Sequence, residues 1–205
     1  MFTGLIREMA EVVSYQNNRL TLKAKYRPKI GDSIAVNGAC LTVIEVREGR
    51  FVVELADETR EVIAMENLKG KVHIEPAMQM GERFEGHIVQ GHIDTIGTVT
   101  AIHKRTNGTD FFIRIPREYL QYIIPKGSVT VDGVSLTVNG VSEEGFRLTI
   151  IPHTLKETLF GTYRIGTRVN IETDLFARYV ANILEKREAA KKSGWERIER
   201  FEALY

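Results

Sequence analysis

Short runs of hydrophobic and β-branched residues, bounded by Gly, Asn, Asp or Pro, recur along the first part of the chain and predict β-strands. The expected strands are Arg19–Lys23, Ser33–Val36, Cys40–Val46, Phe51–Leu55 and Val72–Ile74. The Asn37-Gly38 pair between two apolar runs is typical of a tight hairpin turn. Such a series predicts a small antiparallel barrel, because a closed sheet has no exposed edge strands. Short helices are expected near Thr59–Asn67 and Thr154–Gly161.

The same pattern occurs a second time. The segment from Ser33 to Val43, SIAVNGACLTV, resembles the segment from Ser128 to Val138, SVTVDGVSLTV. The correspondence extends outward: Gly4 and Ile6 match Gly91 and Ile93, and Val72, Ile74 and Glu75 match Val169, Ile171 and Glu172. Two copies of roughly 90 residues predict two domains of one fold, because solenoid repeats are shorter and occur in about three or more copies.

The end of the chain has a different, helical pattern. No glycine or proline occurs from Asp174 to Lys192, and Asp174 is suited to cap a helix N-terminus. Apolar residues recur there at helical spacing, at Phe176, Tyr179, Val180, Ile183 and Leu184, and again after Gly194 at Trp195, Ile198, Phe201 and Leu204. Such a helix can pack on its own barrel or join subunits. We favour the joining of subunits, because neither barrel needs the stripe for closure.

Composition and charge exclude several classes of function. Hydrophobic residues make up 43% of the 205 residues and charged residues 27%, which is ordinary for a globular protein. The net charge of +1 indicates no nucleic-acid partner. No apolar run reaches the length of a membrane helix, and Met1–Ile6 does not begin a signal peptide. The single cysteine, Cys40, excludes an internal disulfide and fits a cytoplasmic location.

Each copy carries a small polar row immediately after its hairpin turn. Alternate residues of a strand point to opposite faces, so Cys40 and Thr42 share one face in the first copy. Ser135 and Thr137 do the same in the second copy, and the residues between them are apolar. Solvated strand faces would produce this pattern in a single copy. Its recurrence in both copies makes a surface cleft in each barrel an equally good interpretation.

The segment Gly86–Asp94 is the second candidate for chemistry. His87 and His92 are five residues apart, which would put them on opposite faces of a strand, so a shared metal site is not expected. His92 could act as a general acid or base, or it could be a structural histidine. It stands where the first copy has Leu5, so only one barrel uses it. No nucleotide-binding or hydrolase motif is present.

Four segments closely resemble the riboflavin synthase family: Met1–Ile6, Val36–Val43, Gly91–Ile93 and Asp132–Val138. The resemblance runs in order from Met1 to about Val180. It implies an all-β fold with a C-terminal helix, in which two tandem, pseudo-symmetric six-stranded Greek-key barrels occupy residues 1–86 and 87–175. Residues 176–205 would form the helix that joins a homotrimer.

The resemblance also implies an activity. Two molecules of 6,7-dimethyl-8-ribityllumazine would exchange a four-carbon unit, giving riboflavin and 5-amino-6-(D-ribitylamino)uracil, without cofactor or metal. Each active site would hold two lumazines between the first barrel of one subunit and the second barrel of its neighbour. Association with lumazine synthase is a further expected partnership.

Residues are carried over position by position. The first pocket is expected to contain Gly4, Leu5, Ile6, Cys40, Leu41, Thr42, Glu54, Leu55, Ala56, Asp57, Glu58 and Thr59, with Phe2, at a mobile end of the chain, near the substrate. The second is expected to contain Gly91, His92, Ile93, Lys126, Asp132, Ser135, Leu136, Thr137, Ile151, Pro152, His153, Thr154, Leu155 and Lys156. The stretch Thr59–Ile63 lacks the Thr-Leu continuation seen at Thr158-Leu159, which weakens the match at the helical edge of the first pocket.

The expected mechanism gives the polar residues three roles. His92, Ser135 and Thr137 would assist removal of a proton from the acidic 7-methyl group of one lumazine. Cys40, or a bound water, would activate the other ring at C7, and Asp132 and Asp174 would orient polar groups. The alternatives are a lumazine- or flavin-binding chromophore protein of the same fold and, more distantly, a flavin-dependent reductase barrel, whose nucleotide-binding domain this chain lacks.

Overall fold

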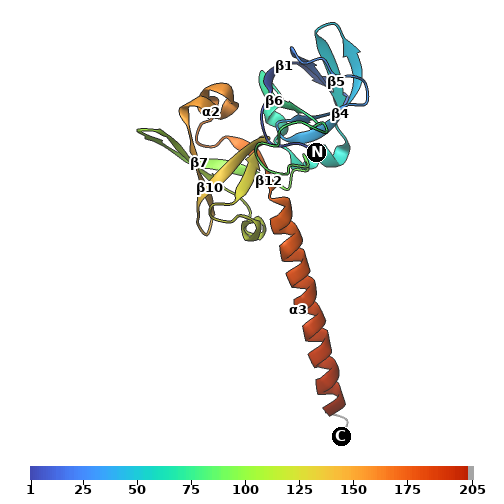
Figure 1. Cartoon of the computed structure of the whole chain (residues 1–205), viewed down its shortest axis with the longest axis vertical. Helices are drawn as coiled ribbons and strands as arrows, with labels where there is room; N and C mark the ends of the chain where they lie inside the picture. Colours follow the sequence, from blue (N-terminus) through green and yellow to red (C-terminus); the bar gives the residue numbers. More distant parts are fainter. Residues whose placement is uncertain (203–205) are drawn as a thin grey trace.

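The computed structural model describes the backbone from Met1 to Glu202 and the side chains from Met1 to Ala190. Within that part of the chain, two closed six-stranded barrels lie side by side, and a long helix leaves the second barrel (Figure 1). All strand neighbours are antiparallel. The fold predicted from the sequence is therefore confirmed.

The first barrel is formed by β1 (Glu8–Gln16), β2 (Arg19–Lys23), β3 (Ser33–Val36), β4 (Ala39–Arg47), β5 (Arg50–Glu54) and β6 (Lys71–Pro76). Its strands follow one another in the order β1-β2-β5-β4-β3-β6. The connection from β5 to β6 contains two short helices, α1 (Asp57–Val62) and η1 (Met65–Asn67).

The second barrel is formed by β7 (Thr95–Arg105), β8 (Gly108–Arg114), β9 (Ser128–Val131), β10 (Val134–Val141), β11 (Gly145–Ile150) and β12 (Arg168–Thr173). Three short helices connect its strands: η2 (Arg117–Tyr122), α2 (Pro152–Glu157) and η3 (Leu159–Thr162). The strand order β10-β11-β8-β7-β12-β9 is the same closed order as in the first barrel. The internal repeat of the sequence is therefore a repeat of topology.

Two elements differ from the sequence-based expectation. The expected list omitted β1, in which a bulge between Val12 and Ser14 interrupts the pairing and mostly half-exposed residues obscure the alternation. The segment Gly86–Asp94 was expected to be a strand, but it is irregular apart from a single bridge between Val89 and Phe2. The argument from strand faces about its two histidines is therefore wrong.

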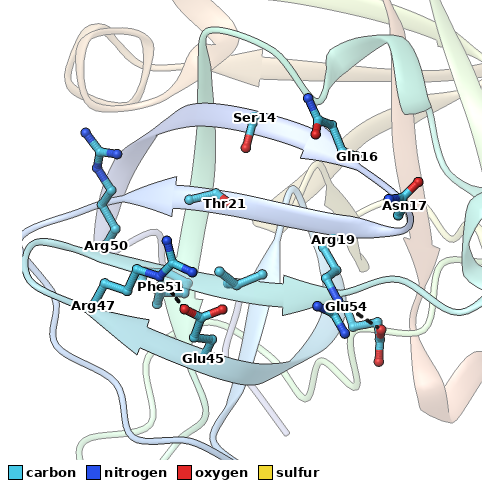
Figure 2. Close-up of a pocket in the computed structure, with 11 residues that line it drawn as sticks. Ser14, Gln16, Asn17, Arg19, Thr21, Glu45, Arg47, Arg50, Phe51 and Glu54 are labelled. Carbon is cyan, nitrogen blue, oxygen red and sulfur yellow. Dashed lines mark hydrogen bonds and ion pairs between the residues drawn. The ribbon is translucent and has the colours of Figure 1, made fainter.

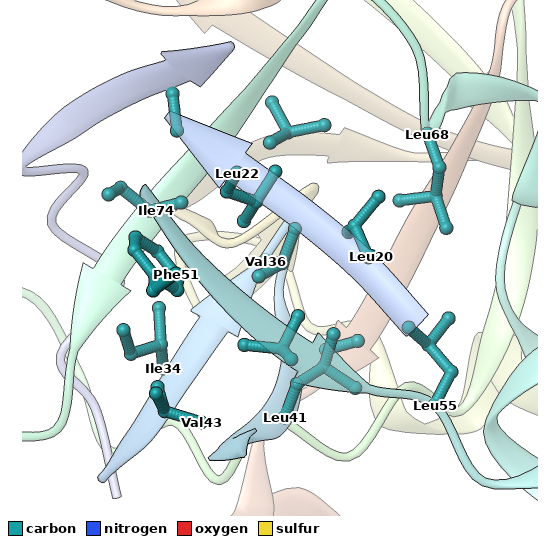
Figure 3. Close-up of a cluster of buried hydrophobic side chains, with 14 of the residues drawn as sticks. Leu20, Leu22, Ile34, Val36, Leu41, Val43, Phe51, Leu55, Leu68 and Ile74 are labelled. Carbon is teal, nitrogen blue, oxygen red and sulfur yellow. The ribbon is translucent and has the colours of Figure 1, made fainter. Parts of the chain in front are cut away.

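Each barrel has its own hydrophobic core, made by the inward-facing residues of its strands. In the first barrel these include Leu20, Leu22, Ile34, Val36 and Phe51, which are almost fully buried (Figure 3). Each such side chain stabilises the fold by about 1.5–3 kcal/mol. The second core contains a T-shaped aromatic pair, Phe111 and Phe160, with ring centroids 5.2 Å apart.

The two barrels meet where their hairpin turns touch. Gly38 and Gly133 have φ angles of +85° and +83°. A Cβ atom on Gly38 would lie 2.7 Å from the backbone nitrogen of Gly133, and the reverse distance is 2.9 Å. Neither position accepts a side chain, because the contact is with rigid backbone. We call this contact region, together with the residues that bridge it, the seam.

A buried histidine and a buried asparagine bridge the seam at equivalent positions. His73 Nδ1 lies 2.8 Å from the Asp132 carbonyl, and its Nε2 accepts a hydrogen bond from Leu159 N at 2.7 Å. Asn170 donates to the Asn37 carbonyl (2.8 Å) through Nδ2 and accepts from Ala64 N (2.7 Å) through Oδ1. Burial lowers the pKa of His73 to about 4, so the ring is neutral and donates through Nδ1.

The helix α3 (Leu175–Glu202) begins immediately after its predicted N-cap. Asp174 Oδ1 accepts hydrogen bonds from Phe176 N (2.8 Å) and Ala177 N (3.3 Å). The helix then points away from both barrels (Figure 1). Its apolar stripe is 52–62% exposed at Phe176, Tyr179, Val180, Ile183 and Leu184. The second predicted stripe, Trp195, Ile198, Phe201 and Leu204, lies outside the residues whose side chains are described.

None of the helices among the described residues has the length and hydrophobicity needed to cross a membrane.

Candidate functional site

Two extended segments cross between the barrels, and each packs on the polar row of the opposite copy. Ser135 N donates to the carbonyl of Gly4 at 2.8 Å, and Cys40 N donates to the carbonyl of Gly91 at 2.9 Å. Ile6 packs against the second core and Ile93 against the first. The expected grouping of these segments is therefore wrong: Gly4–Ile6 lies at the second barrel, and Gly91–Ile93 at the first.

Glycine is required at both crossings. Gly4 and Gly91 have φ angles of +79° and +80°. A Cβ atom would lie 2.5 Å from Ser135 Cβ at Gly4, and 2.6 Å from Cys40 Cβ at Gly91. Both the backbone conformation and the close approach exclude larger residues. The glycines let the backbone of each segment lie directly against the polar row.

Two buried carboxylates hold the crossing segments by their backbone. Glu75 accepts from Thr3 N at 2.8 Å and Gly4 N at 3.0 Å. Glu172 accepts from Gln90 N at 2.7 Å and Gly91 N at 2.9 Å. Burial raises the pKa of both carboxyls, that of Glu172 to about 7, against the opposing effect of these N–H donors. The two clamps are equivalent in the repeat, as the match of Glu75 with Glu172 predicted.

The polar rows face outward, as the strand alternation predicted. Cys40 and Ser135 are half-buried, Thr42 and Thr137 are exposed, and the intervening Leu41 is buried in the core. These rows therefore lie on the outside of the barrels, where the crossing segments cover them in part.

Several expected pocket residues surround the first row. Thr42 is paired with Glu54 across β4 and β5, so both side chains lie on the same outer face. After Glu54 the chain leads into α1, where Ala56, Asp57 and Glu58 are exposed and Thr59 is half-buried. Leu55 is an exception, since it is buried in the first core. The equivalent segment Ile151–Lys156 forms the N-cap and most of α2, and its residues are exposed or half-buried.

Ser135 has a hydrogen-bond partner that the sequence reasoning missed. His87 Nδ1 lies 2.7 Å from Ser135 Oγ, and His87 Nε2 lies 3.4 Å from Thr130 Oγ1. Burial lowers the pKa of His87, and the charge of Asp174 partly opposes this shift. No residue of the first copy aligns with His87, so comparison of the repeats gave no signal for it. Only the tertiary structure brings His87 to the polar row.

The first row has a different environment. His92 is exposed, and its neighbour Gly91 rests on Cys40. Phe2 is fully buried, with Cys40 packed against its cluster, and it exchanges two backbone hydrogen bonds with Val89 at 2.7 and 3.1 Å. The expectation that Phe2 lies at a mobile end is therefore wrong, because these contacts fix it against the barrel.

Asp132 belongs to the seam. It is 1% exposed, and its carboxyl oxygens accept from Tyr163 Oη at 2.5 Å and Asn170 N at 2.7 Å. Burial raises its pKa to about 7. The expectation that Asp132 orients substrate groups is therefore wrong. Lys126, by contrast, is exposed in a loop, with a positive φ of +66°.

Two cavities of the described surface border the polar rows, because each includes the strand partner of a row threonine: Glu54, which is paired with Thr42, and Ser128, which is paired with Thr137. One of about 550 Å³ opens on the outer face of β1, β2, β4 and β5, lined by Arg19, Arg47 and Arg50 among others (Figure 2). Glu54 is the one expected site residue in it. Another of about 430 Å³ lies between η2 and the first turns of α3 and includes Asp174. The candidate site is thus a pair of open outer surfaces.

Among the described residues, no three His, Cys, Asp or Glu side chains are grouped as metal ligands.

Two like barrels in one chain, each with an outward polar row, place it among proteins built from tandem copies of one six-stranded barrel. The model of the lumazine binding domain matches residues 3–77 and again residues 90–174. Curated riboflavin synthases are similar over nearly the whole chain. That of Bacillus amyloliquefaciens is 38% identical, covering 94% of each chain, and that of Photobacterium phosphoreum is 40% identical, covering 90% of this chain and 89% of its own. The chain belongs to the riboflavin synthase family.

Solved structures of LumP share the fold. The complex of LumP with riboflavin has a TM-score of 0.74 at 21% identity, and the complex with 6,7-dimethyl-8-(1'-D-ribityl) lumazine has a TM-score of 0.72 at 20% identity. In both comparisons the similarity covers 84% of this chain and 99% of LumP. The two-barrel architecture is therefore common to these proteins.

Proposed function

We propose that this protein is a riboflavin synthase. It converts two molecules of 6,7-dimethyl-8-ribityllumazine into riboflavin and 5-amino-6-(D-ribitylamino)uracil by transfer of a four-carbon unit. The observation that carries this proposal is the presence of two lumazine binding domains in one chain, with unlike side chains at equivalent positions of their polar rows. A reaction between two copies of one molecule needs similar sites with different chemistry.

Duplication has a clear energetic benefit for such a reaction. Two rings that are held in reacting geometry avoid the entropy loss of a bimolecular encounter, which is worth about 7–11 kcal/mol in well-oriented cases. One barrel surface per ring provides this orientation. We expect the opposing surface to come from the neighbouring subunit, since both polar rows of one chain face outward from its barrels.

The two surfaces differ in the groups that can move a proton. At the second barrel, Ser135 is paired with the neutral His87 at 2.7 Å. A proton of the 7-methyl group can pass to the Ser135 oxygen while the hydroxyl proton passes to His87 Nδ1, leaving the methyl carbanion delocalised into the ring. Thr137 and Asp174 lie beside this pair as orienting groups. The segment of His92 lies on the row of Cys40 rather than on that of Ser135, so this proposal moves His92 from the expected proton removal to activation of the partner ring at C7, together with Cys40.

Assembly into a homotrimer is proposed from the apolar stripe of α3. Five large apolar side chains on one face are more than half exposed. A stripe at this spacing is stable in water when another helix covers it. Helices from neighbouring subunits are the occupants that also bring a first barrel opposite a second barrel. Cytoplasmic location and association with lumazine synthase stay predictions.

The decisive experiment uses 6,7-dimethyl-8-ribityllumazine alone, with no added cofactor or metal. The purified protein should consume two lumazines for each riboflavin that appears, which is followed by riboflavin fluorescence and chromatography. Tight binding of lumazine without consumption would contradict the proposal. That result would favour the alternative, a chromophore-binding protein, for which the shared fold with ligand-bound LumP is the supporting observation.

A further inference from the structure

The base of α3 is joined to the segment that carries His92 by a single arginine. Arg178 lies on the first turn of the helix, and its Nη1 donates to Asp94 Oδ1 at 2.8 Å. Its Nη2 donates to Gln90 Oε1 at 3.1 Å and lies 3.8 Å from Glu172 Oε1. One planar guanidinium therefore contacts residues on both sides of His92.

The contacts of Arg178 are sheltered from solvent. Its side chain is 24% exposed, and those of Asp94 and Glu172 are 13% and 2% exposed. Arg178 Nε is buried and makes no hydrogen bond among the described residues. Leaving a buried donor without a partner is unfavourable by about 1–3 kcal/mol. The side chain is therefore held where it is by its two terminal nitrogens.

The partners of Arg178 are themselves fixed to the second barrel. Asp94 Oδ2 accepts from both Thr173 N and Thr173 Oγ1 at 2.7 Å. The backbone beside Gln90 is held by Glu172, and the carbonyl of Gly91 accepts from Cys40 N at 2.9 Å. A continuous series of charged and backbone hydrogen bonds thus runs from α3, past His92, to the polar row of the first barrel.

The equivalent segment of the first copy lacks this attachment. There, Arg7 stands at the position of Asp94, Leu5 at the position of His92, and Gly81 at the position of Arg178. Glu75 still clamps the backbone of Thr3 and Gly4. The additional clamp is therefore present only in the copy whose crossing segment carries a histidine. An apolar Leu tolerates small displacements, whereas a side chain that acts on a reacting ring does not.

We propose that Arg178 is a positioning residue for catalysis. It holds the Gln90–Asp94 segment, and therefore His92, in a fixed position relative to α3. The inference rests on the proposed function, because it states that turnover of lumazine depends on the exact position of His92. It makes the first turn of α3 part of the site, in addition to any role of the helix in assembly.

The test compares Arg178→Gln with Arg114→Gln. Arg114 is an exposed arginine on β8 whose contact with Glu144 is 3.9 Å long, so its replacement controls for loss of one positive charge. Arg178→Gln should lower kcat about 10- to 100-fold, change KM by less than about threefold and leave the mass by light scattering unchanged. Arg114→Gln should retain wild-type kcat and KM.

A second set of variants tests whether Arg178 positions the His92 segment or only stabilises the fold. Asp94→Asn should reproduce the loss of kcat, and the double variant Arg178→Gln/Asp94→Asn should lose no more than either single variant. Arg178→Lys should fail to restore kcat, because an ammonium group cannot bridge Asp94 and Gln90 as a fork.

Four outcomes would overturn the inference: wild-type kcat in Arg178→Gln, additive losses in the double variant, rescue by Arg178→Lys, or a loss that accompanies dissociation or unfolding. Inactivity of the wild-type protein toward lumazine would instead contradict the proposed function, so the two failures are distinguishable.

Discussion

Two histidines of this protein, one buried and one half-buried, have lowered pKa values but different surroundings. His73 is fully buried and bridges two backbone groups of the seam. His87 is bonded to Ser135, whose row faces outward. Burial keeps both rings neutral. A neutral ring completes the hydrogen bonds of the seam in the first case and can accept a proton in the second.

The seam histidine gives a prediction for stability against pH. The folded-state pKa of His73 is about 4, below its ordinary value of 6.5. Because the unfolded chain binds the proton more readily, the contribution of His73 to wild-type stability should fall by up to about 3 kcal/mol as the pH drops from 6.5 to 4. The raised pKa values of Asp132 and Glu172 act in the opposite direction in both proteins, so the fall is read as the difference between the wild type and His73→Asn, which copies the role of Asn170. Denaturant unfolding at several pH values measures the difference, and parallel curves for the two proteins would contradict it.

His87, the proton acceptor in the proposed reaction, gives a prediction for turnover. His87→Asn can still hydrogen-bond Ser135 but cannot take its proton, so kcat should fall at least about 100-fold with little change in lumazine binding. Since the pKa of His87 is lowered, wild-type kcat should decline only at pH values below the ordinary range of histidine, and the variant should lose that decline. Steady-state kinetics across pH and fluorescence titration provide the two readouts. Equal losses of binding and turnover would show that His87 only shapes the surface.

At the scale of elements, the exchange of crossing segments joins the two barrels most directly. Each segment leaves its own copy and lies on the polar row of the other, so neither row is complete within one copy. Glycine at positions 4 and 91 permits the contact, and Glu75 and Glu172 fix it. The site therefore depends on correct association of the two barrels.

Gly91→Ala tests whether the backbone at Gly91 must lie directly against Cys40. The new Cβ atom would lie 2.6 Å from Cys40 Cβ, at a φ angle that L-residues rarely adopt. We expect a loss of stability of about 2–4 kcal/mol, together with a large loss of activity. Gly166→Ala is the matched control, since Gly166 has a φ of +90° and no atom within 4 Å of the Cβ position. The control should lose only about 1 kcal/mol and keep its activity. Similar losses in both variants would exclude a specific role for the crossing.

At the scale of the whole molecule, two features break the near-symmetry of the repeat. The second copy alone has α3, and the second crossing segment alone has His92 and the arginine clamp. The two features are joined directly, because Arg178 belongs to the first turn of α3 and binds Asp94 and Gln90 on either side of His92. The feature that distinguishes the chemistry of the two copies, the clamped His92 segment, is therefore attached to the helix proposed for assembly.

Charge on the apolar stripe should change the oligomeric state. Val180→Glu places a carboxylate on the exposed apolar face of α3, where Val180 is 56% exposed. Light scattering should show a smaller species than the wild-type protein, for which we propose a trimer, and turnover should fall because the opposing barrel is lost. Glu185→Gln, at an exposed polar position of the same helix, should leave mass and turnover unchanged. An unaltered mass in Val180→Glu would exclude this face from the assembly.

The sequence alone determined the architecture of the protein. Period-two alternation, turn residues and a duplicated motif predicted two barrels, their outward polar rows and the capped helix, because these depend on local backbone preferences and burial. Tertiary structure decided which segment lies on which barrel, since equivalence in a repeat does not say where a segment docks. It also decided that His87 meets Ser135, that Asp132 is buried in the seam and that Arg178 reaches Asp94. Each of these contacts joins residues distant in sequence, and only folding brings them together.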